Sequence, residues 1–539
     1  MSRVVYYRGI RKRTPRPPPA STTMNYMFPR TACLCLALSA LSPLTASDWL
    51  TFGGNPQRTG WAQGEKDIDT NNAKDLTLLW KASLENEPRE LASLTAPVAA
   101  EWVVTQSGMK EVVIVGGASD NLFALDAESG KILWKKTFSA EGKPKQTPSW
   151  LCPSSLNATP LIGKTGLDQR VYTISSDGKL HVLDIHNGED KIPPTQFVPP
   201  FSKNWSLGLY QNVLYTTTSQ GCNGAKSGVY AMDLSKPGRK VTFFQASPAG
   251  AGIWGRAGAV ITPSGMVYAQ TGDGIYDDKA GKLPDTVLQL STADLNLVDF
   301  YTPSNHTYLT RKDLDAGSMS ATYFTFKQWE LLASAGKEGV IALLDAKAIG
   351  GGNHKTPLYR SPLWVNQEAD FSGKGFWGAF ATWEDEAGNR WLSAPALGAA
   401  SDKAPAFAHT NGPAPNGSIM AFKVAEKDGK PVLTPEWISR DMNLPDPPIV
   451  ANGVVYAVST GEFARQWKPD GGLFNSKERI ALHTGNAILY AFDAATGKEL
   501  FSSGTTMPGW THFSGLAISG GRIFVTTFDS TVYAFGLKQ

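Results

Sequence analysis

A short phrase that recurs along this chain constrains its fold more than any other feature. Two apolar or aromatic residues, a small residue and another apolar residue precede Asp and a turn, first at residues 122–126 with Gly130 and Trp134 after them. Further copies lie at 180–184, 229–233, 341–345 and 489–493, and copies without the aspartate at 287–291, 419–423 and 532–536. A repeat of this kind indicates stacked copies of one small unit around a shared core.

Each unit is predicted to contain short strands joined by tight turns. The spacing between copies is about 45 to 60 residues and widens to about 80 before the copy at 419–423 and about 70 after it, a range typical of propeller blades with loop insertions. The 53 glycines and 35 prolines also favour short strands over long helices. The sequence therefore predicts an all-β fold, an eight-bladed β-propeller of four-stranded antiparallel blades. The repeated aspartates are expected to cap their own turns.

The two ends of the chain are predicted to meet in one blade. Residues 76–80 form an orphan outer strand that ends in Trp80, with no blade before it, whereas the last unit, residues 522–535, lacks such a strand. The N-terminal strand is therefore expected to complete the last blade and close the ring, which removes an exposed edge.

Residues 1–46 read as a basic leader followed by a secretory signal peptide. Seven Arg and Lys residues precede a short apolar run at 34–41, and small residues lead to a cleavage site near Ala46. The run is too short for a membrane anchor, so no transmembrane segment is expected in the mature chain. The formal net charge of +3 arises from this leader, and the mildly acidic remainder favours no nucleic acid. We expect a periplasmic or secreted protein whose residues 47–539 form a single propeller.

Two cysteines, Cys152 and Cys222, remain after the leader. In an exported protein they would form a disulfide if they lie close together, and the alternative is two separate buried thiols. No Cys-x-x-Cys-His motif occurs in the sequence, so no covalently bound c-type haem is expected.

The repeat and the opening segment resemble a known family. The pattern Ala-Leu-Asp-x-x-x-Gly-Lys-x-x-Trp at 124–134 and the segment 48–60 are similar to those of propellers with pyrroloquinoline-quinone (PQQ) repeats. That family includes PQQ-dependent alcohol and polyvinyl-alcohol dehydrogenases as well as a non-catalytic lipoprotein of the outer-membrane assembly machinery. The resemblance spans residues 48–537, and it specifies the fold more closely than the function.

The resemblance to the dehydrogenases implies a site for PQQ and Ca²⁺ in the central funnel. Trp254 lies in a segment similar to the family's Trp-Gly strand, and Asp273 replaces the Asn of its Thr-Gly-Asn calcium segment. Lys337 and Trp377 lie in segments similar to further inner-strand regions. The adjacent cysteine pair of the family is absent, and no motif places a catalytic aspartate.

Reasoning from the propeller itself adds further candidates. Segments that precede the inner strands should converge on the axis. Besides Trp254 and Trp377, they carry Trp150, Asn157, Asn204, Trp205, Arg256, Asn443, Trp510 and His512. Together these side chains would line a pocket suited to a flat or sugar-like ligand. The alternative is that each tryptophan packs between blades.

Two functions are therefore compatible with the sequence. The first is a quinoprotein-like oxidoreductase that oxidises an alcohol or a sugar with PQQ. The second is a non-catalytic propeller scaffold that binds a protein or a polysaccharide through its faces and loops.

Overall fold

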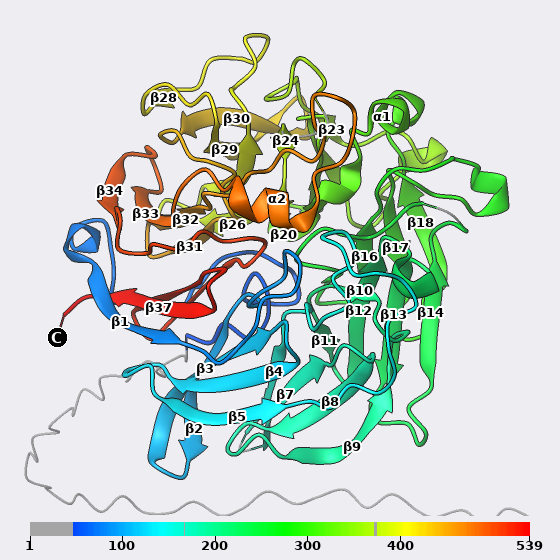
Figure 1. Ribbon diagram of the computed structural model, residues 1–539. Coiled ribbons are helices and arrows are strands. Elements are labelled where there is room, and N and C mark those ends of the chain that lie inside the picture. Colours follow the sequence, from blue (N-terminus) through cyan, green and yellow to red (C-terminus); the bar gives the residue numbers. More distant parts are fainter. Residues whose placement is uncertain (1–46, 167, 249, 371–373, 539) are drawn as a thin grey trace, which may run out of the picture. The chain divides into compact units, whose positions relative to one another are not determined.

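The computed structural model describes residues 47–166, 168–248, 250–370 and 374–538. The predicted leader and signal peptide lie outside the described residues. Small antiparallel sheets are arranged around a central axis (Figure 1), which confirms the predicted eight-bladed β-propeller.

Five blades have four strands each, in sequence order from the first to the last strand of the sheet. They are blade 1 with β2 (Val98–Thr105), β3 (Gly108–Gly117), β4 (Asn121–Asp126) and β5 (Ile132–Thr137); blade 2 with β6 (Leu161–Thr165), β7 (Asp168–Ile174), β8 (Lys179–Asp184) and β9 (Asp190–Gln196); blade 4 with β15 (Val260–Ile261), β16 (Val267–Gln270), β17 (Val287–Leu290) and β18 (Leu297–Tyr301); blade 5 with β20 (Thr322–Phe326), β21 (Trp329–Ala335), β22 (Ile341–Asp345) and β23 (Tyr359–Arg360); and blade 7 with β31 (Ile449–Ala451), β32 (Val454–Ser459), β33 (Ile488–Asp493) and β34 (Glu499–Ser502).

Blades 3 and 6 keep this plan but carry additional short strands. Blade 3 consists of β10 (Lys203–Asn204), β11 (Gly208–Tyr210), β12 (Val213–Ser219), β13 (Gly228–Asp233) and β14 (Val241–Gln245). Blade 6 consists of β24 (Gly375–Phe376), β26 (Ala381–Glu384), β27 (Arg390–Leu397), β28 (His409–Thr410), β29 (Gly417–Lys427) and β30 (Lys430–Ile438). The connection 398–416, which contains β28, accounts for part of the wider spacing that the sequence shows here.

Blade 8 closes the ring as predicted. It consists of β35 (Leu516–Ser519), β36 (Arg522–Thr526), β37 (Thr531–Gly536) and, on its outer edge, β1 (Thr77–Ser83). The antiparallel register runs from Thr77 opposite Gly536 to Ser83 opposite Thr531. Hydrogen bonds between the two ends of the propeller therefore replace an open edge.

The remaining elements lie in the connections. They are the pair β19 (Met319–Ser320) and β25 (Gly378–Ala379), the helices α1 (His306–Lys312) and α2 (Ser476–Ala481), and the 3₁₀ turns η1 (Ala73–Asp75), η2 (Cys222–Gly224), η3 (Asp278–Ala280), η4 (Ala316–Ser318) and η5 (Gly351–Asn353). Within the described residues, no helix is both long enough and apolar enough to cross a bilayer.

The repeated motif joins neighbouring blades. Asp126 accepts hydrogen bonds from the backbone N–H groups of Glu128 and Ser129 at 3.0 and 2.9 Å, so it caps its turn as expected. The tryptophan of the preceding blade then docks on this turn: Nε1 of Trp80 donates to the carbonyl of Ala127 at 2.8 Å. A Cβ atom on Gly130 would lie 2.5 Å from the ring of Trp80, so the motif needs glycine there. Trp134 and Trp437 dock in the same way on the turns of blades 2 and 7.

The segment 48–65, which we call the N-terminal strap, contacts all eight blades in turn. Its backbone groups bond to Ala99 of blade 1, Ile162 of blade 2, Ile261 of blade 4, Tyr323 of blade 5, Thr382 of blade 6 and Val450 of blade 7. Side chains of the strap contact the two remaining blades. Thr51 Oγ1 donates to the carbonyl of Leu207 beside blade 3, and the Glu65 carboxylate accepts from the N–H of Gly521 in blade 8. The strap therefore ties the inner ends of the blades together.

Candidate functional site

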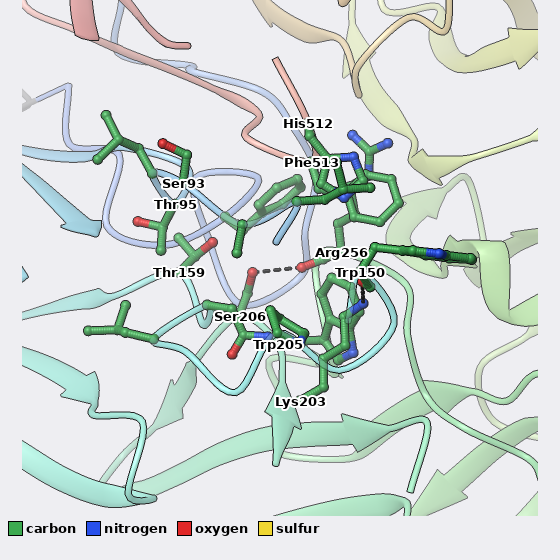
Figure 2. A pocket seen from close by; sticks show the side chains of 17 residues that line it. Ser93, Thr95, Trp150, Thr159, Lys203, Trp205, Ser206, Arg256, His512 and Phe513 are labelled. Atoms are coloured by element: carbon green, nitrogen blue, oxygen red, sulfur yellow. Dashed lines mark hydrogen bonds between the residues drawn. The ribbon is translucent and has the colours of Figure 1, made fainter. Parts of the chain in front are cut away.

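The segments that enter the inner strands surround a funnel-shaped cavity of about 260 Å³. Its wall combines aromatic, acidic and basic side chains: Trp150, Trp205, Trp254, Trp377, Phe513, Asp273, Asp313, Asp315, Glu462, Lys203, Lys337, Arg479 and His512. A second, smaller cavity of about 50 Å³ adjoins it and shares Trp150, Lys203, Trp205, His512 and Phe513 with it (Figure 2). Phe52 of the N-terminal strap also lines the smaller cavity.

Two tryptophans form one aromatic corner of the funnel. The ring centroids of Trp254 and Trp377 lie 5.4 Å apart in an edge-to-face arrangement. The ammonium group of Lys337 lies 5.5 Å from the Trp254 ring and 5.4 Å from the Trp377 ring, within reach of a cation–π interaction. Gly272 lets the Trp254 indole approach its neighbours, because a Cβ atom there would lie 3.0 Å from Nε1.

Three carboxylates gather beside this corner. One oxygen from each of Asp273, Asp313 and Asp315 lies within 4.8 Å of the others. Lys337 Nζ lies 3.0 Å from Asp313 and 2.7 Å from Asp315, and Trp254 Nε1 donates to Asp315 at 2.9 Å. Three carboxylates face one ammonium group, so the acidic cluster carries excess negative charge when all of them are ionised.

The pKa values in this cluster respond to burial and to charge. Burial raises the pKa of Asp313 to about 6, although the positive charge of Lys337 opposes the rise. The surrounding protein, followed by the charge of Asp315, also raises the pKa of Asp273. Burial lowers the pKa of Lys337, but the charges of Asp315 and Asp313 outweigh it and the net shift is upward. Lys337 therefore stays protonated beside the carboxylates.

Asp285 supports the acidic cluster from behind. Its N–H donates to the carbonyl of Gly272 at 2.8 Å, and its carboxylate accepts from the N–H of Ala316 at 3.1 Å. Asp285 thus connects the segment that carries Asp273 with the segment that carries Asp315. Burial, and then the charge of Asp315, raise the pKa of Asp285 to about 8.

The opposite side of the funnel is basic. Arg479 donates to Glu462 at 2.8 Å, and Glu462 also bonds to Nδ1 of His512 at 2.7 Å. Burial lowers the pKa of His512, although the charge of Glu462 opposes this, so the ring stays neutral near pH 7. Arg256 pairs with buried Asp446 and stacks on Phe513, with 3.9 Å from the guanidinium carbon to the ring centroid.

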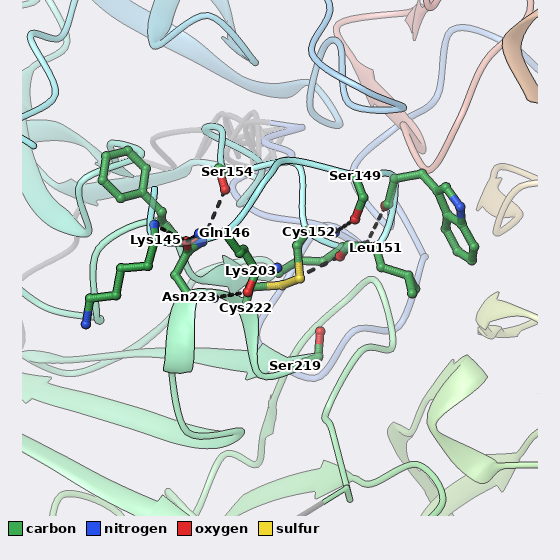
Figure 3. The surroundings of a disulfide bond; sticks show 12 residues. Lys145, Gln146, Ser149, Leu151, Cys152, Ser154, Lys203, Ser219, Cys222 and Asn223 are labelled. Atoms are coloured by element: carbon green, nitrogen blue, oxygen red, sulfur yellow. Dashed lines mark hydrogen bonds between the residues drawn. A yellow bond between two sulfur atoms is a disulfide. The ribbon is translucent and has the colours of Figure 1, made fainter. Parts of the chain in front are cut away.

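A disulfide joins two loops of the funnel wall. The sulfur atoms of Cys152 and Cys222 lie 2.06 Å apart, and the two residues are separated by 70 positions (Figure 3). Their neighbours Leu151 and Gln220 line the funnel. The bond therefore connects the entry to blade 2 with the hairpin between β12 and β13, unlike the adjacent pair of the dehydrogenases that the sequence resembles.

The structure brings together most of the residues that the sequence singled out. Trp254, Asp273, Lys337 and Trp377 all line the funnel, and Asn157 and Arg256 line the smaller cavity. Trp510 lines neither of these two cavities. It packs between the rings of Phe528 and His483, with centroid distances of 4.4 and 6.2 Å. Its neighbour His512 reaches the funnel instead.

Sequence reasoning missed Asp313, Asp315 and Lys203. The first two form an Asp-x-Asp pattern before Ala316 and Gly317, and that pattern was the available signal. Lys203 stands next to Asn204 and Trp205, which the sequence placed near the axis, but nothing distinguishes it from a surface lysine.

Eight blades around a funnel with aromatic, acidic and basic walls define the class of this protein as a β-propeller with a polar central site.

Residues 64–208 match a family model, PQQ_2, described as outer membrane protein assembly factor BamB. A curated protein, 1-butanol dehydrogenase (cytochrome c) of Thauera butanivorans, is 27% identical over 262 residues, which are 46% of this chain and 35% of that protein. The chain thus spans about a third of the length of this relative.

Solved structures of low sequence identity share the fold. The quinohemoprotein alcohol dehydrogenase from Comamonas testosteroni is 13% identical with a TM-score of 0.57, over 91% of this chain and 80% of that chain. A europium-containing methanol dehydrogenase is 13% identical with a TM-score of 0.59, over 91% of this chain and 98% of that chain. These likenesses show that the chain shares the β-propeller fold of the two dehydrogenases.

Proposed function

We propose that this protein is an exported, quinoprotein-like oxidoreductase that binds PQQ and a divalent cation in its funnel and oxidises an alcohol or a sugar. One observation carries the proposal. The funnel has an excess of carboxylates at one end, an excess of cationic side chains at the other, and tryptophan rings on its wall. Such a site suits a flat, anionic ligand that also contacts a metal ion.

The residues present fit both groups. Ca²⁺ takes oxygen ligands, and Asp273, Asp313 and Asp315 offer carboxylate oxygens within 4.8 Å of one another. PQQ is a planar quinone with three carboxylates, and the rings of Trp254, Trp377 and Trp205 offer flat apolar surfaces for its ring system. The solved structures named above include a quinohemoprotein alcohol dehydrogenase and a europium-containing methanol dehydrogenase, and their shared fold supports the proposal.

The chain's own residues would bind the substrate hydroxyl and take its proton. When bound, PQQ supplies the acceptor for the two electrons that leave the alcohol. Asp313 and Asp315 share the ammonium of Lys337 and act as a coupled pair, so the hydroxyl proton passes to this pair as a unit. Without a bound metal ion, burial raises the pKa of Asp313 to about 6, so its carboxylate is ionised at neutral pH.

Lys337 and Trp254 would hold this base in place. Lys337 contacts both carboxylates, and Trp254 fixes one oxygen of Asp315 through its indole N–H. Asp315 is buried, whereas the Asp313 side chain is 42% exposed and is the more accessible member of the pair.

Titration of the purified full chain with PQQ, with and without Ca²⁺, tests the proposal through quenching of tryptophan fluorescence. We expect saturable quenching that requires Ca²⁺ and is weakened in Trp254→Ala and Asp315→Asn. Asp168→Asn serves as the matched control, because Asp168 is an exposed carboxylate in blade 2. The absence of binding at high micromolar PQQ would refute the oxidoreductase proposal.

A non-catalytic scaffold is the second candidate, and the β2–β3 hairpin favours it. Trp102, Val104 and Met109 of this hairpin expose 50%, 44% and 59% of their surface, which gives a protein or polysaccharide an apolar contact area. The family model that matches the chain also describes an assembly factor. A funnel that binds no PQQ would leave this function as the better account.

Export forms part of the proposal. The basic leader with its apolar run is typical of a secretory signal. The Cys152–Cys222 bond supports it, because disulfides persist in oxidising compartments such as the periplasm. Mass spectrometry of the protein recovered from the periplasm would test it through the position of the new N-terminus.

A further inference from the structure

Lys203 is a buried cation without an ionic partner. It begins the inner strand β10 of blade 3, lines both cavities, and exposes only 9% of its surface. Its nearest polar contact is the carbonyl oxygen of Trp150 at 3.5 Å, and its ammonium group lies 5.3 Å from the centroid of the Trp205 ring. Lys203 forms no ion pair with any carboxylate of the described residues.

The carboxylates nearest to this end of the funnel are already paired. Glu462 bonds to Arg479 and His512, and Asp446 bonds to Arg256. This end of the funnel therefore has two carboxylates but three basic side chains, because Lys203 adds to the two arginines. Burial, followed by the charge of Arg479, lowers the pKa of Lys203 to about 7. An ammonium group in this position costs free energy unless an anion accompanies it.

Other polar atoms at the same place also lack partners. Nη2 of Arg256 and Oδ1 of Asn157 are buried and form no hydrogen bond within the described part of the chain, and both residues line the smaller cavity. Figure 2 shows Lys203, Trp205 and Arg256 on one side of this cavity and the side chains of Ser93 and Thr95 on another. Unpaired donors and an acceptor around one small volume indicate that a polar group belongs there.

We propose that Lys203 and Arg256 form a binding site for a carboxylate group, placed where the smaller cavity meets the funnel. The site rests on the proposed function, because it assigns the carboxylate to the ligand whose other end meets the acidic cluster. A planar quinone with carboxylates on its rim satisfies both ends of the funnel at once. The carboxylate of an acidic substrate has the same chemistry, and the experiment separates the two sources.

Calorimetric titration of the full chain with three probes tests this inference in the presence of Ca²⁺. The probes are PQQ, its trimethyl ester, in which the carboxylates carry no charge, and benzene-1,3-dicarboxylate, a small dicarboxylate without a chelating ring nitrogen. Lys203→Met keeps the length and apolar character of the side chain while it removes the charge. Lys236→Met is the matched control, because the Lys236 side chain is 65% exposed and pairs only with a nearby surface aspartate.

We expect Lys203→Met to weaken PQQ binding by about 10- to 100-fold, because a charge-assisted hydrogen bond is lost. Affinity for the trimethyl ester should not change between wild type and Lys203→Met, and Lys236→Met should bind all probes like wild type. The ligand-free Lys203→Met chain should also melt at a higher temperature than wild type, because an unpaired buried charge has been removed. This second readout shows that the variant is folded.

The outcomes distinguish this inference from the proposed function. A wild-type chain that binds the dicarboxylate through Lys203 but does not bind PQQ rejects the quinone and assigns the site to an acidic substrate. Equal affinity of wild type and Lys203→Met for both PQQ and the dicarboxylate overturns the carboxylate site even if PQQ binds. A wild-type chain that binds neither PQQ nor the dicarboxylate overturns both proposals.

Discussion

Replacement of Arg58 by alanine should loosen the whole ring, although Arg58 belongs to no blade. This fully buried side chain of the N-terminal strap donates to Ala259 O at 3.1 Å, Phe52 O at 2.9 Å, Leu207 O at 3.0 Å and Thr51 Oγ1 at 2.6 Å. Burial without a carboxylate partner lowers its pKa to about 9, so it is still protonated at pH 7. Its guanidinium thus joins the strap to blades 3 and 4.

The magnitude follows from the acceptors that Arg58→Ala leaves behind. Leu207 O keeps the hydroxyl donor of Thr51 at 2.6 Å, whereas Ala259 O and Phe52 O lose the Arg58 donor. Each stranded buried carbonyl costs about 1–3 kcal/mol, and the cavity adds to this while the released guanidinium partly offsets it. We expect a loss of about 4 kcal/mol. At about 2 cal/mol/K per residue, a chain of this size has an unfolding entropy near 1 kcal/mol/K, so Tm should fall by about 4 °C.

Two measurements check this expectation. Thermal unfolding followed at several scan rates gives the shift in Tm while it reveals any irreversible step. Hydrogen exchange is more specific, because the N–H groups of Ile261, Tyr323, Thr382 and Val450 donate to carbonyls of the strap. These amides should exchange faster in Arg58→Ala.

Arg170→Ala provides the matched control. Arg170 forms a surface ion pair with Asp168, with side chains 36% and 44% exposed, and such pairs contribute about 0–1 kcal/mol. If Arg58→Ala lowers Tm no further than Arg170→Ala, or leaves the four amides protected, then the strap does not hold the blades and the reasoning fails.

Three further predictions concern the funnel. Asp285→Ala should weaken Ca²⁺-dependent PQQ binding by about tenfold, because the hydrogen bond from Ala316 N–H is lost. Asp285→Asn keeps an acceptor for this bond, so its PQQ affinity should stay within about twofold of wild type. Equal effects of the two variants in PQQ titrations would contradict this prediction. Reduction of the Cys152–Cys222 bond, which closes a loop of 70 residues, should cost about 4 kcal/mol, and a Tm that dithiothreitol leaves unchanged would argue against it. PQQ affinity should fall as the pH rises above about 7, because neutral Lys203 must then take up a proton to bind a carboxylate, and Lys203→Met should abolish this slope in calorimetry.

The fold could be predicted from the sequence because its signals are local. Asp126 caps a turn only two and three residues away, and Gly130 is needed where Trp80 docks, so each blade carries its own evidence. Ring closure was predictable for the same reason, since the unpaired strand that ends in Trp80 resembles the outer strand that carries Trp134. The strap was not predictable in this way, because its partners lie in eight separate blades.

The site was only partly predictable, because a propeller assembles it from segments that are distant in the sequence. Trp254, Asp273, Lys337 and Trp377 were found through their local motifs, which the family resemblance made visible. Trp510 was expected at the axis from its position before an inner strand. Residues 508–515 form an irregular segment in which side chains do not alternate as they do in a strand, so His512 and Phe513 face the funnel and Trp510 packs on Phe528.

Lys203 shows why the missing residues matter for function. A lysine at the start of a strand has no distinctive sequence signal. Its role depends on whether a carboxylate lies nearby in the folded chain. Glu462 and Asp446 pair with other cations, so no carboxylate among the described residues is left to pair with the ammonium group of Lys203. At the opposite end Lys337 neutralises only part of the charge of three aspartates. Both ends of the funnel therefore lack counter-charges, and the metal-bound, carboxylated ligand that we propose would supply both.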